Sequence, residues 1–382
     1  MLTILTGLIF FISGIAQSTD HEYDQEDILL KVIYSLQSDG SGFYEKGVFP
    51  SQRLHPVLNK KYEDNNIFFT GLIVLILQDA KPYLSEKSRE IIDSITQRAT
   101  RNYQEYKNKK GYPIYNFWRT SPSMHFPNDV VLSKLKKFKL PEDFDDTSII
   151  YMTDEHEDEL SAWLKSEMKN HTNMHRHQIQ NTFEQYQEIP AYSTWFGLNM
   201  PIDFDICVHA NTMSMVYDYN FELNKYDSAS MFLIRNMILK NYHLTDPAYI
   251  SPHYQKASTI LYHVARLISY ADDDYFDPVK PRIIGDLQLL LRDSESFMES
   301  IILSSALMKL GVCPETKIES SLLESDIGSY HFFVANMAST LGNPWKKWLG
   351  YTDIFDFPYE CEAYDYALIL ENIILYKQMN CE

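Results

Sequence analysis

The sequence Asp143-Phe-Asp-Asp-Thr-Ser148 places three carboxylates within four residues, at what its flanks predict to be the start of a helix. Pro141 and Glu142 precede it, and proline and acidic residues are common in the first turn of helices. Acidic side chains there cap free backbone N–H groups, which is an ordinary structural role. Crowded and buried carboxyl groups also raise one another's pKa, so that one can stay protonated at neutral pH and donate a proton.

A second segment repeats part of this pattern sixty positions later. Asp203-Phe-Asp205 follows Pro201 and precedes residues 206–219, a stretch of helical character. Self-similarity at this spacing predicts repeated helical hairpins. If both copies begin inner helices of one fold, their carboxylates share a single mouth. The candidate catalytic residues are therefore Asp145, Asp143, Asp146, Asp203 and Asp205.

Helical periodicity dominates the chain and predicts the fold class. Residues 67–77 are apolar on every side, which indicates a helix buried all round, whereas residues 85–106 are amphipathic. An inner ring of buried helices and an outer ring of half-exposed ones would produce this alternation. We therefore predict an all-α protein, an α/α toroid of helical hairpins, with a stacked solenoid as the alternative. Two-residue alternation is scarce, so no sheet is expected. Further helices are predicted at 160–168, 228–240, 256–270, 282–291, 296–310, 321–341 and 363–377.

An aromatic loop leads into the acidic segment. Residues 111–118 read Gly-Tyr-Pro-Ile-Tyr-Asn-Phe-Trp, and residues 126–129 read Phe-Pro-Asn-Asp. Loops of this composition beside an acidic helix start are more typical of a site wall than of a linker. Tyr115, Trp118 and His209 are the predicted substrate-binding residues.

Bulk properties restrict the class of protein. The chain has 382 residues, 45% of them hydrophobic, which suffices for one large domain over residues 20–382. Its net charge of -18 argues against a nucleic-acid partner, because no basic stripe is present to neutralise phosphates. Residues 1–16 resemble an export signal peptide, with an uncleaved anchor as the alternative. The signal peptide predicts an exported protein, secreted or periplasmic, and no other segment is apolar and long enough to span a bilayer.

Cysteine and histidine residues give weaker signals. Cys361 and Cys381 flank the last predicted helix and could form a disulfide bond in an exported chain. His171, His175 and His177 are a possible metal cluster, but their polar segment favours solvated histidines instead. Asn170 begins a glycosylation sequon that has meaning only in a eukaryotic secretory pathway.

The acidic segment resembles the acid motif of class II terpene cyclases. Gln37-Ser-Asp-Gly-Ser-Gly-Phe43 is similar to the Gln-x-x-Asp-Gly-Ser-Trp repeat of the same superfamily. The resemblance implies an α/α toroid that protonates an isoprenoid or another hydrophobic alkene, without a cofactor. It further implies that Asp145 is the proton donor, while Asp143 orients and tunes it.

Three other functions fit the same residues. Asp205-Ile-Cys207 together with His263 is similar to the zinc ligands of protein prenyltransferases, members of the same superfamily. An exported carbohydrate-active toroid would instead pair Asp143, Asp145 or Asp146 with a carboxylate of the second copy. The third is a non-catalytic interaction protein, in which the acidic segments cap helices or form a calcium-like site.

Overall fold

The computed structural model describes residues 25–198, 200–271, 273–315 and 326–381. The predicted signal peptide, residues 1–16, lies outside this part of the chain. The helices are α2 (Gln25–Leu36), α3 (Phe68–Ala80), α4 (Glu86–Thr100), α5 (Phe144–Thr153), α6 (Asp158–Met168), α7 (Ile206–Asp218), α8 (Lys225–Leu239), α9 (Tyr242–Thr245), α10 (Pro247–Ile250), α11 (Ala257–Tyr270), α12 (Lys280–Asp293), α13 (Phe297–Lys309), α14 (Trp345–Leu349) and α15 (Glu362–Met379). The strands are β1 (Ser51–His55), β2 (Lys60–Asp64), β3 (Phe333–Asn336) and β4 (Asp356–Glu360).

The strands correct the predicted fold class. Within the described residues they form a four-stranded antiparallel sheet in the order β2-β1-β4-β3. The protein is therefore a mixed protein of helices and a sheet, and the predicted all-α α/α toroid is wrong. The predicted helix at residues 321–341 is also wrong, because its described part contains β3 and turns. The sheet forms because strands from distant parts of the chain pair, for example with Arg53 opposite Tyr359. Local periodicity in the sequence does not show such pairing.

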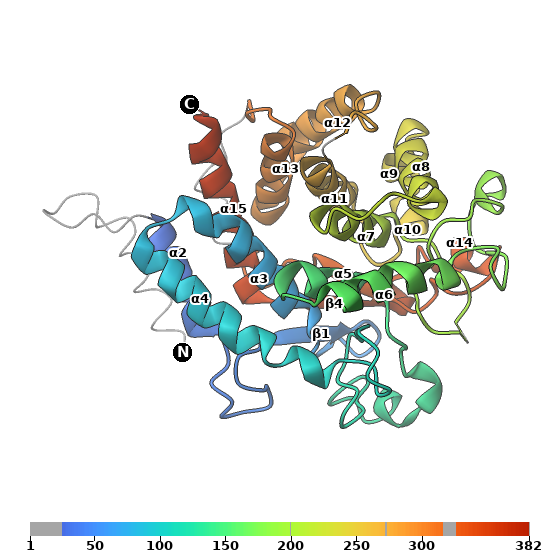
Figure 1. Ribbon diagram of the computed structural model, residues 1–382, viewed down its shortest axis with the longest axis horizontal. Coiled ribbons are helices and arrows are strands. Elements are labelled where there is room, and N and C mark those ends of the chain that lie inside the picture. Colours follow the sequence, from blue (N-terminus) through green and yellow to red (C-terminus); the bar gives the residue numbers. More distant parts are fainter. Residues whose placement is uncertain (1–24, 199, 272, 316–325, 382) are drawn as a thin grey trace, which may run out of the picture.

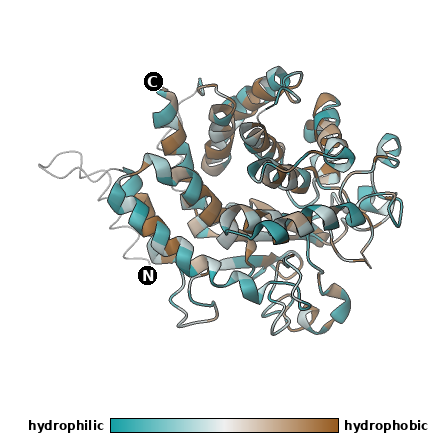
Figure 2. Ribbon diagram, in the orientation of Figure 1, coloured by the Kyte–Doolittle hydropathy of each residue, from teal (hydrophilic) through white to brown (hydrophobic). Residues whose placement is uncertain are grey.

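The buried helices pack in a closed sequence of contacts. Helix α3 contacts α5, α5 contacts α7, and α7 contacts α11, which packs on α13; α15 then joins α13 back to α3. Helix α3 is buried on almost its whole surface, from Phe68 to Leu77, as residues 67–77 predicted. Around these helices lie half-exposed ones, among them α4, α8 and α12, whose hydrophobic residues gather on one side (Figures 1 and 2). Apolar surface is thus removed from water on both sides of the inner helices.

A disulfide bond joins Cys313 to Cys381, with their Cα atoms 5.6 Å apart. The Cys361–Cys381 bond that the sequence left open does not form, and Cys361 is a buried free thiol. The eighteen residues of α15 lie between those two positions. A helix of that length is about 27 Å long, several times the Cα separation that a disulfide bond permits.

None of the helices in the described part of the chain is long and apolar enough to cross a bilayer.

The sheet lies at the end of the helices where α3, α5 and α7 begin. In Figure 1, β1 and β4 run beneath α3 and α5. Side chains of β3 and β4 line the same cavity as side chains from the beginnings of these three helices. This meeting of helix N-termini and sheet forms the candidate site.

Candidate functional site

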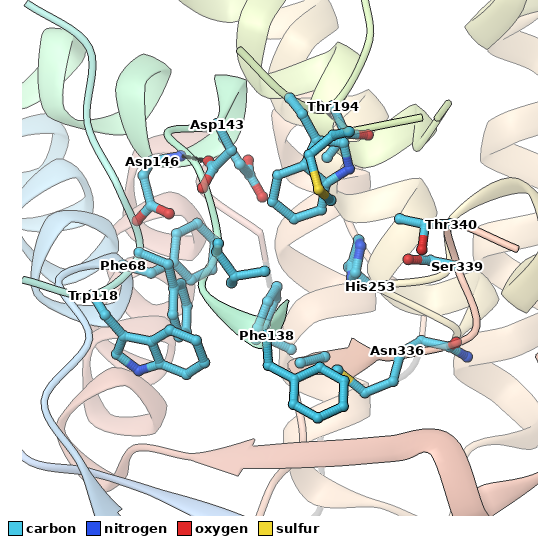
Figure 3. Close-up of a pocket in the computed structure, with 18 of the residues that line it drawn as sticks. Phe68, Trp118, Phe138, Asp143, Asp146, Thr194, His253, Asn336, Ser339 and Thr340 are labelled. Atoms are coloured by element: carbon cyan, nitrogen blue, oxygen red, sulfur yellow. Dashed lines mark hydrogen bonds between the residues drawn. The ribbon is translucent and has the colours of Figure 1, made fainter. Parts of the chain in front are cut away.

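The site is a cavity of about 250 Å³ between the N-terminal ends of α3, α5 and α7 and the sheet. Most of its wall is aromatic or aliphatic, and the carboxyl groups at the start of α5 enter it from one side (Figure 3). The apolar and aromatic lining residues are Phe68, Phe117, Trp118, Phe126, Phe138, Leu140, Trp195, Met200, Val208, Phe333, Ala335, Met337 and Tyr359. The polar ones are Lys137, Lys139, Asp143, Asp145, Asp146, Thr194, His253, Asn336, Ser339 and Thr340.

Asp143 fixes the start of α5. Its carboxylate accepts a hydrogen bond of 2.8 Å from the backbone N–H of Asp146, which is the N-cap arrangement expected from the sequence. Its own N–H donates to the carbonyl of Tyr115, and the next N–H, of Phe144, donates to that of Thr194. The aromatic loop and the segment before the second acidic copy thus hold this helix start in place.

Asp143 and Asp146 form a buried carboxyl pair (Figure 3). Burial raises the pKa of Asp143 to about 7, even though its bonds to Asp146 lower it. Burial also raises the pKa of Asp146 far above its ordinary value, and the charge of Asp143 and a hydrogen bond with it raise it further. Oδ1 of Asp146 has no hydrogen-bond partner among the described residues. The pair therefore holds a proton at neutral pH and presents a polar atom that the protein does not satisfy.

Asp145 has a different environment. Its Oδ1 accepts a hydrogen bond from Asn211 and its Oδ2 accepts one from Tyr254. Burial raises its pKa to about 6, whereas these two bonds and the charge of Arg266 lower it. Arg266 is buried and donates to the side-chain carbonyl of Asn211. This chain of donors favours the ionised form of Asp145 over the protonated one.

Two further buried side chains line the cavity, and each has a polar atom without a hydrogen-bond partner. Nε1 of Trp195 and Nε2 of His253 have no partner among the residues that the structure describes. Nδ1 of His253 lies 3.3 Å from the carbonyl of Val334. Buried polar atoms are rarely left without a partner, so atoms of this kind in one cavity indicate a place where a ligand is recognised.

The second acidic copy does not line the cavity. Asp203 is buried and forms an ion pair of 3.0 Å with Lys346, and Asn181 also donates to it. Burial raises the pKa of Asp203, and the charge of Lys346 opposes the rise. Asp205 caps α7 through the N–H of Cys207 and also accepts from Ser251. Both carboxylates thus hold local structure together, although Oδ2 of Asp203 has no hydrogen-bond partner among the described residues.

Of the predicted substrate-binding residues, one lines the cavity and two lie outside its wall. Trp118 lines the cavity, and its indole N–H donates to Asp64 at 2.8 Å. Tyr115 lies outside the wall, with its hydroxyl 3.2 Å from His156, and His209 lies outside with Nε2 2.7 Å from the carbonyl of Tyr192. The shared mouth predicted from the sequence therefore contains Asp143, Asp145, Asp146 and Trp118, but not the other predicted residues.

The arrangement does not fit either metal site suggested by the sequence. No group of three or more His, Cys, Asp or Glu side chains in the described ranges is placed to hold a metal ion. His263, the proposed third zinc ligand, has Nδ1 2.8 Å from the carbonyl of Thr259, and burial raises the pKa of the Cys207 thiol. His171 instead pairs with Glu167 at 3.0 Å.

Several residues of the site were not predicted from the sequence: Lys137, Lys139, Trp195, Asn211, His253, Tyr254 and Arg266. One signal was available, since residues 134–139 read Lys-Leu-Lys-Lys-Phe-Lys in a chain of net charge -18. The others come from loops and helix interiors that carry no motif.

Comparisons with protein-family models, curated proteins and solved structures find no match to this chain. The resemblance to class II terpene cyclases thus gains no support from known relatives, and the function has to be argued from the cavity itself.

Proposed function

We propose that this protein is an enzyme that transfers a proton to a largely apolar substrate, an isoprenoid or another hydrophobic alkene. The observation that carries the proposal is the buried Asp143–Asp146 pair, which opens on an aromatic cavity and whose Asp146 pKa is raised well above its ordinary value. A carboxyl group kept neutral in this way is a general acid at neutral pH.

We assign the donor role to Asp146 rather than to Asp145, the residue implied by the family resemblance. Asp145 accepts hydrogen bonds on both carboxylate oxygens, from Asn211 and Tyr254, and its pKa of about 6 leaves it mostly ionised at pH 7. Asp146 has an oxygen without a partner at the cavity wall. Asp145 then acts as a fixed negative charge beside the developing cation.

The proposed reaction conserves atoms without a co-reactant. The O–H bond of Asp146 breaks, a C–H bond forms at one alkene carbon, and the neighbouring carbon becomes a cation. Aromatic faces such as those of Phe68, Phe117 and Trp118 stabilise a cation and exclude water. Loss of a proton from an adjacent carbon to the Asp146 carboxylate restores the acid, so that the net reaction is an isomerisation or a cyclisation.

A carbohydrate substrate is the second candidate, and one observation favours it. Thr194, Asn336, Ser339 and Thr340 supply hydroxyl and amide groups to the cavity wall. Glycoside cleavage, however, requires a second carboxylate across the cavity from the first. Asp203 and Asp205, which were predicted to provide it, are engaged elsewhere.

Deuterium incorporation tests the proposal. The full-length protein is incubated with farnesol or geranylgeraniol in deuterated water, and the products are analysed by gas chromatography with mass spectrometry. We expect isomerised or cyclised products that carry deuterium on carbon, and we expect Asp146→Asn to abolish them. Asp293→Asn is the matched control, because Asp293 is exposed and distant in sequence from the site. Products without carbon-bound deuterium, or full activity of Asp146→Asn, would refute proton transfer from this residue.

A further inference from the structure

The opening of the cavity carries positive charge in a strongly acidic protein. Lys137 and Lys139 line the cavity and are exposed to solvent. They belong to a run of lysines at positions 134, 136, 137 and 139, whereas the whole chain has a net charge of -18. A local charge opposite to that of the whole molecule concentrates anions at this place.

Neither Lys137 nor Lys139 forms an ion pair with a carboxylate of the described residues. Burial lowers the pKa of Lys139, and the charge of Lys109 lowers it further, against a smaller opposing effect of Glu142. Inside the cavity, the Asp143–Asp146 pair retains a proton, whereas Asp145 is ionised. The two lysines are thus the exposed cations of a cavity whose negative charge is buried.

The lysines are held beside the apolar wall. Nζ of Lys137 lies 4.8 Å from the centre of the Phe138 ring, which lines the cavity. Asn116 donates a hydrogen bond of 2.8 Å to the carbonyl of Leu140, just after the lysine run. Cationic groups at the opening and aromatic rings behind them are complementary to a molecule with an anionic end and an apolar body.

We propose that Lys137 and Lys139 bind the anionic head group of an amphiphilic substrate, a carboxylate or a phosphate monoester, whose apolar chain enters the cavity. Binding of the head group does not depend on the proposed proton transfer. Only the reaction of the substrate's apolar chain rests on that proposed function. With the head fixed at the mouth, the depth of the cavity selects which double bond of the chain meets Asp146.

Binding of simple amphiphiles tests the head-group site directly. Isothermal titration calorimetry is carried out on the full chain with dodecyl phosphate, dodecanoate, dodecanol and inorganic phosphate, each below its aggregation concentration. We expect dodecyl phosphate or dodecanoate to bind about ten- to a hundredfold more tightly than dodecanol, as one or two charge-assisted hydrogen bonds provide. The ratio of the two anions identifies the head group. Inorganic phosphate alone is expected to bind far more weakly, because it has no chain to bury.

Two double variants of the same charge separate a specific site from general attraction. Lys137→Gln with Lys139→Gln removes the lysines that line the cavity, and we expect the preference for the anionic amphiphile to disappear while dodecanol binding is kept. Lys134→Gln with Lys136→Gln removes two exposed lysines of the same run that do not line it. This control is expected to keep the preference. Equal losses in the two variants, or equal affinity of dodecanol and the anions in the unaltered protein, would overturn the head-group site.

The outcome is independent of the proton-transfer test. If the anionic preference is found but no substrate takes up deuterium, the head-group site stands and the proposed reaction fails. If deuterium is incorporated without any preference for the anionic amphiphile, the proposed reaction stands and the head-group site fails.

Discussion

The two Asp-Phe-Asp segments are identical in sequence, yet they are used differently. In the first, Asp143 caps the helix, so that Asp145 and Asp146 fall in its first turn. In the second, Asp205 is the cap, and Asp203 lies ahead of the helix. The helix start is shifted by two residues between the copies.

This shift determines the chemistry of each copy. Carboxyl groups inside the first turn of α5 enter the cavity without an ion pair, so burial raises their pKa, although the charge of Arg266 lowers that of Asp145. Asp203 instead meets Lys346, a residue far along the chain, and its charge is neutralised. A repeated motif therefore does not imply a repeated function; the position of the helix start and the available partner decide it.

The largest expected difference between the copies is in turnover. Asp146→Asn should lower turnover about 10²- to 10⁴-fold, the usual contribution of a general acid. An amide change in the second copy, Asp205→Asn, keeps a residue that can cap α7 and should cost less than about tenfold. Steady-state rates of both purified variants, with circular dichroism to verify folding, measure the difference. Equal losses would mean that the second copy also serves the reaction.

The next largest effect is a loss of stability when the ion pair of the second copy is broken. Lys346→Met leaves the buried Asp203 carboxylate without its cation, which should lower the free energy of unfolding by about 3–5 kcal/mol. Lys347→Met, the same change at the exposed neighbour, is the control and should have little effect. Urea unfolding curves compare the two. A loss below that of the control would show that the ion pair does not hold this copy.

The first copy should contribute to the pH dependence of stability. The folded-state pKa values of Asp143 and Asp145, about 7 and about 6, lie above the ordinary value of 3.8. Their contribution to stability is therefore complete in acid and is lost as the pH rises through about 6 to 7. The unaltered protein should melt several degrees lower at pH 8 than at pH 5, and Asp143→Asn should reduce that difference. A melting temperature that rises over this range in both proteins would contradict the raised values.

The smallest effect concerns a single hydrogen bond to the second copy. Ser251→Ala removes one donor to Asp205, which retains the N–H groups of Cys207 and His253. We expect a loss of about 1 kcal/mol in unfolding free energy and no change in the pH profile of turnover. Thermal unfolding and a pH–rate profile check both statements. A shifted profile would show that Asp205 is coupled to the reacting acid.

Local patterns predicted part of this structure. The uniformly apolar residues 67–77 predicted a buried helix, and the acidic cluster predicted a helix start at Asp143; both predictions are confirmed. These features depend on residues close together in the chain, where periodicity and capping act.

The sheet and half of the site depend on distant pairings instead. Strand β2 reads Lys-Lys-Tyr-Glu-Asp and becomes a strand because it pairs with β1, which in turn pairs with β4. The role of Asp203 depends on Lys346, and the ionisation of Asp145 depends on Asn211, Tyr254 and Arg266. A single sequence gives no signal for such pairs.

The closed order of helix contacts has a consequence for synthesis on the ribosome. Helix α3, apolar on nearly all sides, packs on α5 but also on α15, which is made almost three hundred residues later. Until α15 emerges from the ribosome, the face of α3 that packs on α15 in the folded protein stays uncovered. We expect the nascent chain to depend on chaperones during this interval, because exposed apolar helix surface promotes aggregation.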